Sequence, residues 1–99
     1  MQLSYFVLYV RDLAKSAEFY SRLGLKLVAE QHGKGPQHYS CTFGGVTLEL
    51  YPAGNRSVTR IRLGLEITPT PAVEELLEKH GSRVLKDPDG NSVELLRGS

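Results

Sequence analysis

With 99 residues, of which 40% are apolar, the chain suits one globular domain that buries only about two-thirds of its unfolded surface. Twelve basic and eleven acidic residues leave a formal charge of +1, which gives no electrostatic footprint for nucleic acid or an anionic membrane. The lone Cys41 excludes an internal disulfide, and no stretch approaches the roughly 20 apolar residues of a membrane span, so we expect a cytoplasmic protein.

The first half of the sequence predicts a strand, a helix and three more strands. Residues 3–10 alternate in a β-branched and aromatic composition that is typical of a strand. Asp12 suits the N-cap of a helix over residues 13–23, and Gly24 supplies the left-handed stop. Further strands are predicted at residues 25–30, 38–43 and 46–51, separated by a polar, glycine-rich turn at 31–37 and a tight turn at 44–45.

The second half predicts a shorter version of the same order. Residues 52–58 are polar and rich in turn formers, and they are the linker candidate between a first unit (1–51) and a second unit (59–99). Because this linker is short, we expect two halves of a single domain. The second unit predicts a strand at 59–67, a helix at 72–80, a short strand at 83–86, a turn at 87–90 and a last strand at 92–96.

Self-similarity supports this division into two units. The run GGVTLEL at residues 44–50 returns as GNSVELL at 90–96, which makes Glu49 and Glu94 equivalent positions. Gly24 lies 25 residues before Glu49, whereas Gly81 lies only 13 before Glu94, so the second unit lacks about one strand and its turn. By strand count, two strands after the helix in place of three would leave the last strand antiparallel to the first strand of its unit, but the direction of this strand and the aim of Glu94 stay open.

Two motifs carry a resemblance to a known family. Residues 10–20 read V-x-D-L-x-x-S-x-x-F-Y and residues 87–95 read D-P-D-G-N-x-x-E-L, a pair that resembles the vicinal oxygen chelate superfamily. That superfamily holds glyoxalase I, extradiol dioxygenases, fosfomycin-resistance enzymes and bleomycin-resistance proteins. The resemblance implies an α+β fold of two tandem βαβββ-type units, the second shortened by about one strand, forming curved mixed sheets with helices on the outer face. By analogy it also implies a homodimer.

The resemblance also assigns metal-ligand positions, one to each of four strands. They fall on Tyr5, Glu49, Arg62 and Glu94. Neutral tyrosine is a poor ligand for a divalent ion, and arginine has no lone pair to give. We therefore expect no metal cofactor and reject the extradiol reaction, while a weakly held Mg, Mn, Ni or Zn ion stays open as an alternative.

Strand alternation places a set of polar and aromatic side chains on one face of the predicted sheets. The set comprises Tyr5, Tyr9, Thr47, Glu49, Tyr51, Arg62 and Glu94. The opposite face is more aliphatic, so helices should cover that side. The open face either meets water alone or forms a cavity. In a cavity, Arg62 would occupy the place of the metal and bridge Glu49, Glu94 or both, below a wall of tyrosines.

The remaining polar residues have simpler explanations. His32 and His38 flank the glycine-rich turn, where a surface role is the default, because a metal ligand on a mobile turn is hard to hold in geometry. His80 precedes Gly81 at the end of a helix, where a cation suits the helix dipole. Asp87 and Asp89 are predicted to be turn residues.

Three functions stay open on these grounds. The first is a metal-free binding protein that takes a small aromatic or anionic ligand through Tyr5, Tyr9, Thr47, Tyr51 and Arg62. The second is a metal-dependent lyase or isomerase of the glyoxalase type, with Glu49 and Glu94 as catalytic bases. The third is an interaction module without a small ligand, since a missing strand leaves a sheet edge open to a partner.

Overall fold

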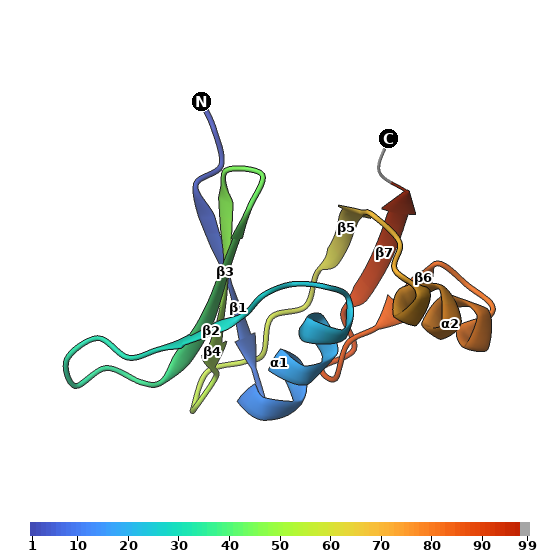
Figure 1. The fold of residues 1–99 in the computed structure, drawn as a ribbon. Helices are drawn as coiled ribbons and strands as arrows, with labels where there is room; N and C mark the ends of the chain where they lie inside the picture. The colour runs from blue at the N-terminus through green and yellow to red at the C-terminus, as the bar shows by residue number, and fades with distance from the viewer. Residues whose placement is uncertain (98–99) are drawn as a thin grey trace.

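The computed structural model describes residues 1–97, and within this range the chain forms strands and helices in the expected order (Figure 1). Neither helix is long and apolar enough to cross a membrane. The elements are β1 (Tyr5–Val10), α1 (Leu13–Arg22), β2 (Val28–Glu30), β3 (His38–Phe43), β4 (Val46–Pro52), β5 (Arg62–Ile67), α2 (Pro71–His80), β6 (Val84–Lys86) and β7 (Ser92–Arg97).

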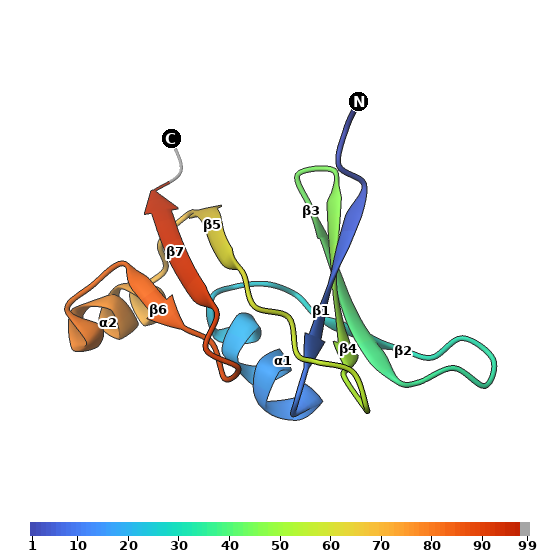
Figure 2. The same cartoon turned by 180° about the vertical axis from the view of Figure 1, so that it is seen from behind.

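The strands form two mixed sheets, as the predicted fold class requires. The first sheet has the order β1-β4-β3-β2 and the second has the order β5-β7-β6. In each sheet the first strand pairs in parallel with the last strand of its unit, β1 with β4 and β5 with β7. Figures 1 and 2 show α1 lying between the two sheets and α2 flanking the three-stranded sheet. The chain therefore has an α+β fold of two related units, of which the second is one strand shorter.

The direction of the last strand corrects one expectation. β7 runs parallel to β5, not antiparallel. The antiparallel prediction assumed that the first strand after the helix runs parallel to the first strand of the unit. In the second unit the turn after α2 leads straight into β6, which is antiparallel to β7, so the missing strand is the counterpart of β2. The register consequently keeps Glu94 opposite Gly64, as Glu49 lies opposite Val7.

One apolar core joins the two units. On each sheet the aliphatic face is buried, as the alternation predicted, and the helices cover it with Tyr20 from α1 and with Val73 and Leu77 from α2. A fully buried aliphatic side chain contributes about 1.5–3 kcal/mol to stability. The strand residues in this cluster are Leu8, Val10, Leu48, Leu50, Leu65, Leu85, Val93 and Leu95.

The ends of the elements follow local chemistry. The side chain of Asp12 accepts a hydrogen bond from Lys15 N at 3.1 Å and caps α1. Gly81 ends α2 at φ 66°, a conformation that favours glycine. The strand expected at 59–67 begins only at Arg62, because the preceding residues use their backbone groups elsewhere. Along the free edge of β1, Thr59 N donates a hydrogen bond to Tyr9 O, and Tyr9 N donates one to the Thr59 hydroxyl oxygen. Ile61 N donates to Asn91 Oδ1 at 2.6 Å.

The D-P-D-G-N loop is more than a turn. Asp87 is 4% exposed, and it accepts hydrogen bonds from the Tyr20 hydroxyl at 2.7 Å and from Asn91 N at 2.8 Å. Asp89 accepts from Arg11 N at 3.3 Å. Burial and the hydrogen bond to Asp87 raise the pKa of Tyr20 above its usual value. The loop therefore ties the second unit to α1 and to the end of β1, and holds the two sheets side by side.

Candidate functional site

The open face of the first sheet carries the predicted polar and aromatic residues of the first unit. Tyr5, Tyr9, Glu49 and Tyr51 alternate along β1 and β4 with inward-facing residues, of which Leu8, Val10, Leu48 and Leu50 are fully buried. Register pairs Tyr5 with Thr47 and Tyr9 with Tyr51. Tyr5 is 62% exposed, whereas Tyr9 and Tyr51 are half-buried. The two inner tyrosines therefore sit in a more sheltered part of this face than Tyr5 does.

A hollow of about 760 Å³ opens beside these two tyrosines. Tyr9 and Tyr51 lie with ring centroids 6.3 Å apart and planes tilted by 53°. The guanidinium carbon of Arg56 lies 4.5 Å from the centroid of the Tyr9 ring, a cation–π arrangement. The hollow is lined by Tyr9, Pro36, Tyr51, Pro52, Ala53, Gly54, Asn55 and Arg56.

Arg56 was not among the residues predicted for the site. It belongs to the segment interpreted as a linker, and nothing in its spacing relates it to a strand face. The structure gives this segment a definite course, because Ala53 N donates to Val10 O at 2.8 Å and Arg56 N donates to Ala53 O at 3.0 Å. The resulting turn folds Arg56 back over β1, where it faces the aromatic residues of the open face.

His38 also departs from its expected surface role. It is the first residue of β3, points to the open face and is only 2% exposed. Its imidazole stacks on the Tyr51 ring with centroids 4.2 Å apart and planes only 7° from parallel. Its Nδ1 lies 3.2 Å from the carbonyl oxygen of Pro36. A carbonyl can only accept a hydrogen bond, so Nδ1 is the donor in this contact and Nε2 is left to face the neighbouring side chains.

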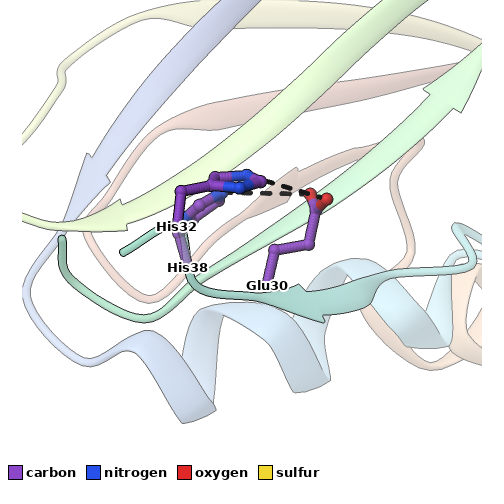
Figure 3. Close-up of side chains that lie close together, drawn as sticks. All are labelled: Glu30, His32 and His38. Carbon is purple, nitrogen blue, oxygen red and sulfur yellow. Dashed lines mark ion pairs between the residues drawn. The ribbon is translucent and has the colours of Figure 1, made fainter. Parts of the chain in front are cut away.

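Three polar side chains gather at the end of β2. Figure 3 shows His32 and His38 pointing toward the carboxylate of Glu30. One candidate ligand atom from each of the three lies within 4.8 Å of the others. His38 Nε2 is 3.8 Å from Glu30 Oε1, and His32 Nε2 is 3.9 Å from Glu30 Oε2. The Ser40 hydroxyl donates to Glu30, which fixes this carboxylate beside the two imidazoles.

Glu49 approaches the same histidine from β4. Its Oε2 lies 3.8 Å from His38 Nε2, and its side chain is 20% exposed. Partial desolvation, followed by the negative charges of Glu49 and Glu30, raises the pKa of Tyr51 above its usual value. The Tyr51 hydroxyl therefore keeps its proton at neutral pH and remains a hydrogen-bond donor.

The second sheet presents Arg62 and Glu94. Arg62 Nη2 lies 2.9 Å from Glu94 Oε1, and the two side chains are 62% and 36% exposed. Arg62 therefore reaches one of the two glutamates proposed for it. Within residues 1–97 it makes no ion pair with Glu49, which lies on the other sheet beside His38. An ion pair this exposed contributes at most about 1 kcal/mol.

The four family ligand positions do not fit a metal ion. Arg62 has no lone pair, and its guanidinium is bound to Glu94, one of the two surviving carboxylates. Tyr5 is a neutral, largely exposed phenol. The positions that the family resemblance assigns to ligands therefore offer only two carboxylates, Glu49 and Glu94, on separate sheets.

Comparison with known families gives a match over most of the chain. The model of the Glyoxalase/Bleomycin resistance protein/Dioxygenase superfamily matches residues 2–80. No protein with a curated description matches the sequence.

Solved structures share the fold at low sequence identity. The oxidase ChaP-H2 has a TM-score of 0.74 at 17% identity, over 100% of this chain and 94% of that protein. TnmS3, an antibiotic-binding protein from Streptomyces sp. CB03234, has a TM-score of 0.70 at 22% identity, over 100% and 97%. A lactoylglutathione lyase from Agrobacterium tumefaciens has a TM-score of 0.66 at 20% identity, over 98% and 93%. These similarities extend over nearly the full length of both proteins compared, and they establish the fold alone.

Proposed function

Because this chain belongs to the glyoxalase/bleomycin resistance protein/dioxygenase superfamily, we propose that it binds a small aromatic or anionic molecule on the open face of its first sheet. The hollow lined by Tyr9, Tyr51 and Arg56 carries this proposal. It is large enough for a ligand, since sites for small organic molecules commonly enclose about 300–1,000 Å³. The hollow also places the rings of Tyr9 and Tyr51 beside the cationic side chain of Arg56.

Each of these groups recognises a different feature of a ligand. The tilted rings of Tyr9 and Tyr51 offer stacking surface to a flat molecule. Arg56 offers a planar, bidentate donor to a carboxylate or another anion. Tyr51 holds a phenolic proton and can donate to a ligand oxygen. The anion-binding role first assigned to Arg62 thus passes to Arg56, because Arg62 is already paired with Glu94.

The family background supports a role in binding. TnmS3, which shares the fold over nearly its whole length, is described as an antibiotic-binding protein. In the proposed role the ligand is held without a metal at the family ligand positions, where Arg62 and Glu94 pair with each other. A lyase mechanism that joins Glu49 and Glu94 has less support, since each glutamate has its own partner on its own sheet.

We further propose that the chain is a homodimer in solution. The second sheet leaves the Arg62–Glu94 pair exposed, together with Leu96 on the same face of β7, which is 42% exposed. A second copy could cover this face. Sedimentation equilibrium measures the mass directly, and a mass near 11.0 kDa at all concentrations would refute the dimer.

The binding proposal is tested with 2-naphthoate as a flat aromatic anion and neutral 2-naphthol as its uncharged analogue. We expect calorimetry to give a higher affinity for 2-naphthoate, a loss of that preference in R56Q, and weaker binding of both compounds in Y51A. R22Q is the matched control, because Arg22 lies on α1 and is exposed. Equal loss of binding in R22Q and R56Q, or no preference for the anion in the parent protein, would count against the proposal.

A further inference from the structure

We propose that Glu30, His32 and His38 bind one divalent transition-metal ion of the zinc class. The site lies where β2 ends and β3 begins, on the open face of the first sheet. It is separate from the ligand positions that the family resemblance assigns, because none of the three residues occupies one of them. The proposal does not depend on the small-molecule ligand proposed above.

The donor set is of the right kind. Two imidazole nitrogens and one carboxylate form a set that proteins use at catalytic zinc sites, where a fourth position stays open. Bonds of about 2.0–2.1 Å place tetrahedral ligands roughly 3.3 Å apart. The three donor atoms lie within 4.8 Å of one another, so they must approach by up to about 1.5 Å to meet on one ion. His32 is 74% exposed on the turn and is free to make that movement.

The unpartnered nitrogen of His38 is an independent indication. Its Nε2 is buried and has no hydrogen-bond partner among residues 1–97. Buried polar atoms are nearly always partnered, so such an atom calls for an explanation. The opposite nitrogen donates to the Pro36 carbonyl at 3.2 Å, which leaves Nε2 directed at Glu30 and Glu49. A backbone carbonyl that holds one imidazole nitrogen is the usual second partner of a metal-binding histidine.

The charges around His38 also favour a cation. Glu30 and Glu49 both lie 3.8 Å from the same nitrogen. In the described part of the chain their ion-pair partners are histidines, and no lysine or arginine lies within ion-pair distance of either carboxylate. Two carboxylates that face the same imidazole repel each other, and a divalent ion between them offsets that repulsion. Glu49 thus adds negative charge next to the three proposed ligands.

The site borders the proposed ligand hollow. His38 stacks on Tyr51, and Pro36, whose carbonyl orients His38, also lines the hollow. A bound ion would fix the His38 ring and, through the stack, the Tyr51 ring. Metal binding should therefore be detectable both as a direct signal from the ion and as ordering of the neighbouring wall of the hollow.

Zinc and cobalt are the probes for the test. Protein stripped with a chelator is titrated with Zn²⁺ by calorimetry and with Co²⁺ by visible absorption, because d–d bands report the ligand geometry. We expect one ion per chain, an affinity at least about tenfold lower in E30Q and in H32Q, and an unchanged affinity in H80Q. His80 is an exposed histidine at the end of α2 and serves as the control.

No variant of His38 is used, because His38 is buried and its replacement risks unfolding the protein. His32 is exposed, so H32Q removes a ligand without that risk. The parent protein should also show cobalt bands of a four- or five-coordinate site, and these bands should disappear in E30Q. Failure of the parent protein to bind either ion would overturn the proposal. Binding of undiminished affinity in both E30Q and H32Q would overturn it as well. Either result leaves the naphthoate experiment unaffected, so the two proposals fail separately.

Discussion

Replacing Tyr20 with phenylalanine tests the loop that ties the two units together. The Tyr20 hydroxyl donates to Asp87 Oδ2 at 2.7 Å, and both residues are buried. A hydrogen bond to a charged group contributes about 1.5–3 kcal/mol. In Y20F the Asp87 carboxylate still accepts hydrogen bonds from Asp89 and Asn91, so the substitution removes one bond and leaves the others in place. We expect Y20F to lower the free energy of unfolding by about 1.5–3 kcal/mol near neutral pH.

The same interaction predicts a dependence on pH with a definite sign. The pKa of Tyr20 is higher in the folded state than its usual value of 10.0, chiefly because of burial. The protonated hydroxyl therefore stabilises the fold fully below pH 10.0 and progressively less as the pH rises beyond it. The parent protein should lose about 1.4 kcal/mol per pH unit in this range through Tyr20. The stability gap between the parent protein and Y20F should narrow by the same amount.

Urea unfolding followed by circular dichroism at several pH values between about 8 and 11.5 measures both effects. Y39F is the control, because Tyr39 is half-buried and its hydroxyl makes no hydrogen bond within residues 1–97. It should change stability by less than about 0.5 kcal/mol. A Y20F penalty equal to that of Y39F would refute the reasoning. A gap that stays constant above pH 10 would refute the raised pKa of Tyr20 in the folded state.

Three further substitutions test the local structure by the same unfolding assay. D12A removes the cap of α1 and should cost about 1 kcal/mol, whereas no loss would mean that Lys15 N finds another acceptor. G81A places a Cβ at φ 66° and should cost about 1–2 kcal/mol, and a neutral result would show that α2 ends differently. E94Q weakens only the exposed pair with Arg62 and should change stability by less than about 1 kcal/mol, so a larger loss would mean that this pair is buried in the assembly.

Much of the fold could be predicted because local signals and the sheet pattern agree. The Asp12 cap, the glycine stops and the alternation along β1 and β4 each specify an element, and all strands and helices lie where expected within a few residues. The repeat of GGVTLEL identified Glu49 and Glu94 as equivalent positions, and the register of the two parallel pairs agrees with this. The family match over residues 2–80 confirms the resemblance, and the two mixed sheets confirm the α+β fold of two related units.

The direction of β7 and the ligand hollow could not be predicted for a different reason. The number of strands fixes the direction of the last strand only if the direction of the first strand after the helix is known. After Gly81 the chain enters β6 in the opposite direction to the one assumed. Arg56 reaches the hollow through a turn in a segment without periodicity. His38 was expected at the surface, at the start of its predicted strand, but its imidazole is buried and stacks on Tyr51. Each of these features depends on how a loop folds in space.

The central claim is that the hollow beside Tyr9, Tyr51 and Arg56 is the place where a ligand binds. Amide chemical-shift mapping of the labelled protein, titrated with a mixture of flat aromatic carboxylates, tests it most directly. The largest shift changes should cluster on the end of β4, on the turn at Ala53 to Arg56 and on Tyr9. Changes centred on the groove beside α2, which includes Leu76 and Lys79, or no saturable change at all, would contradict the claim.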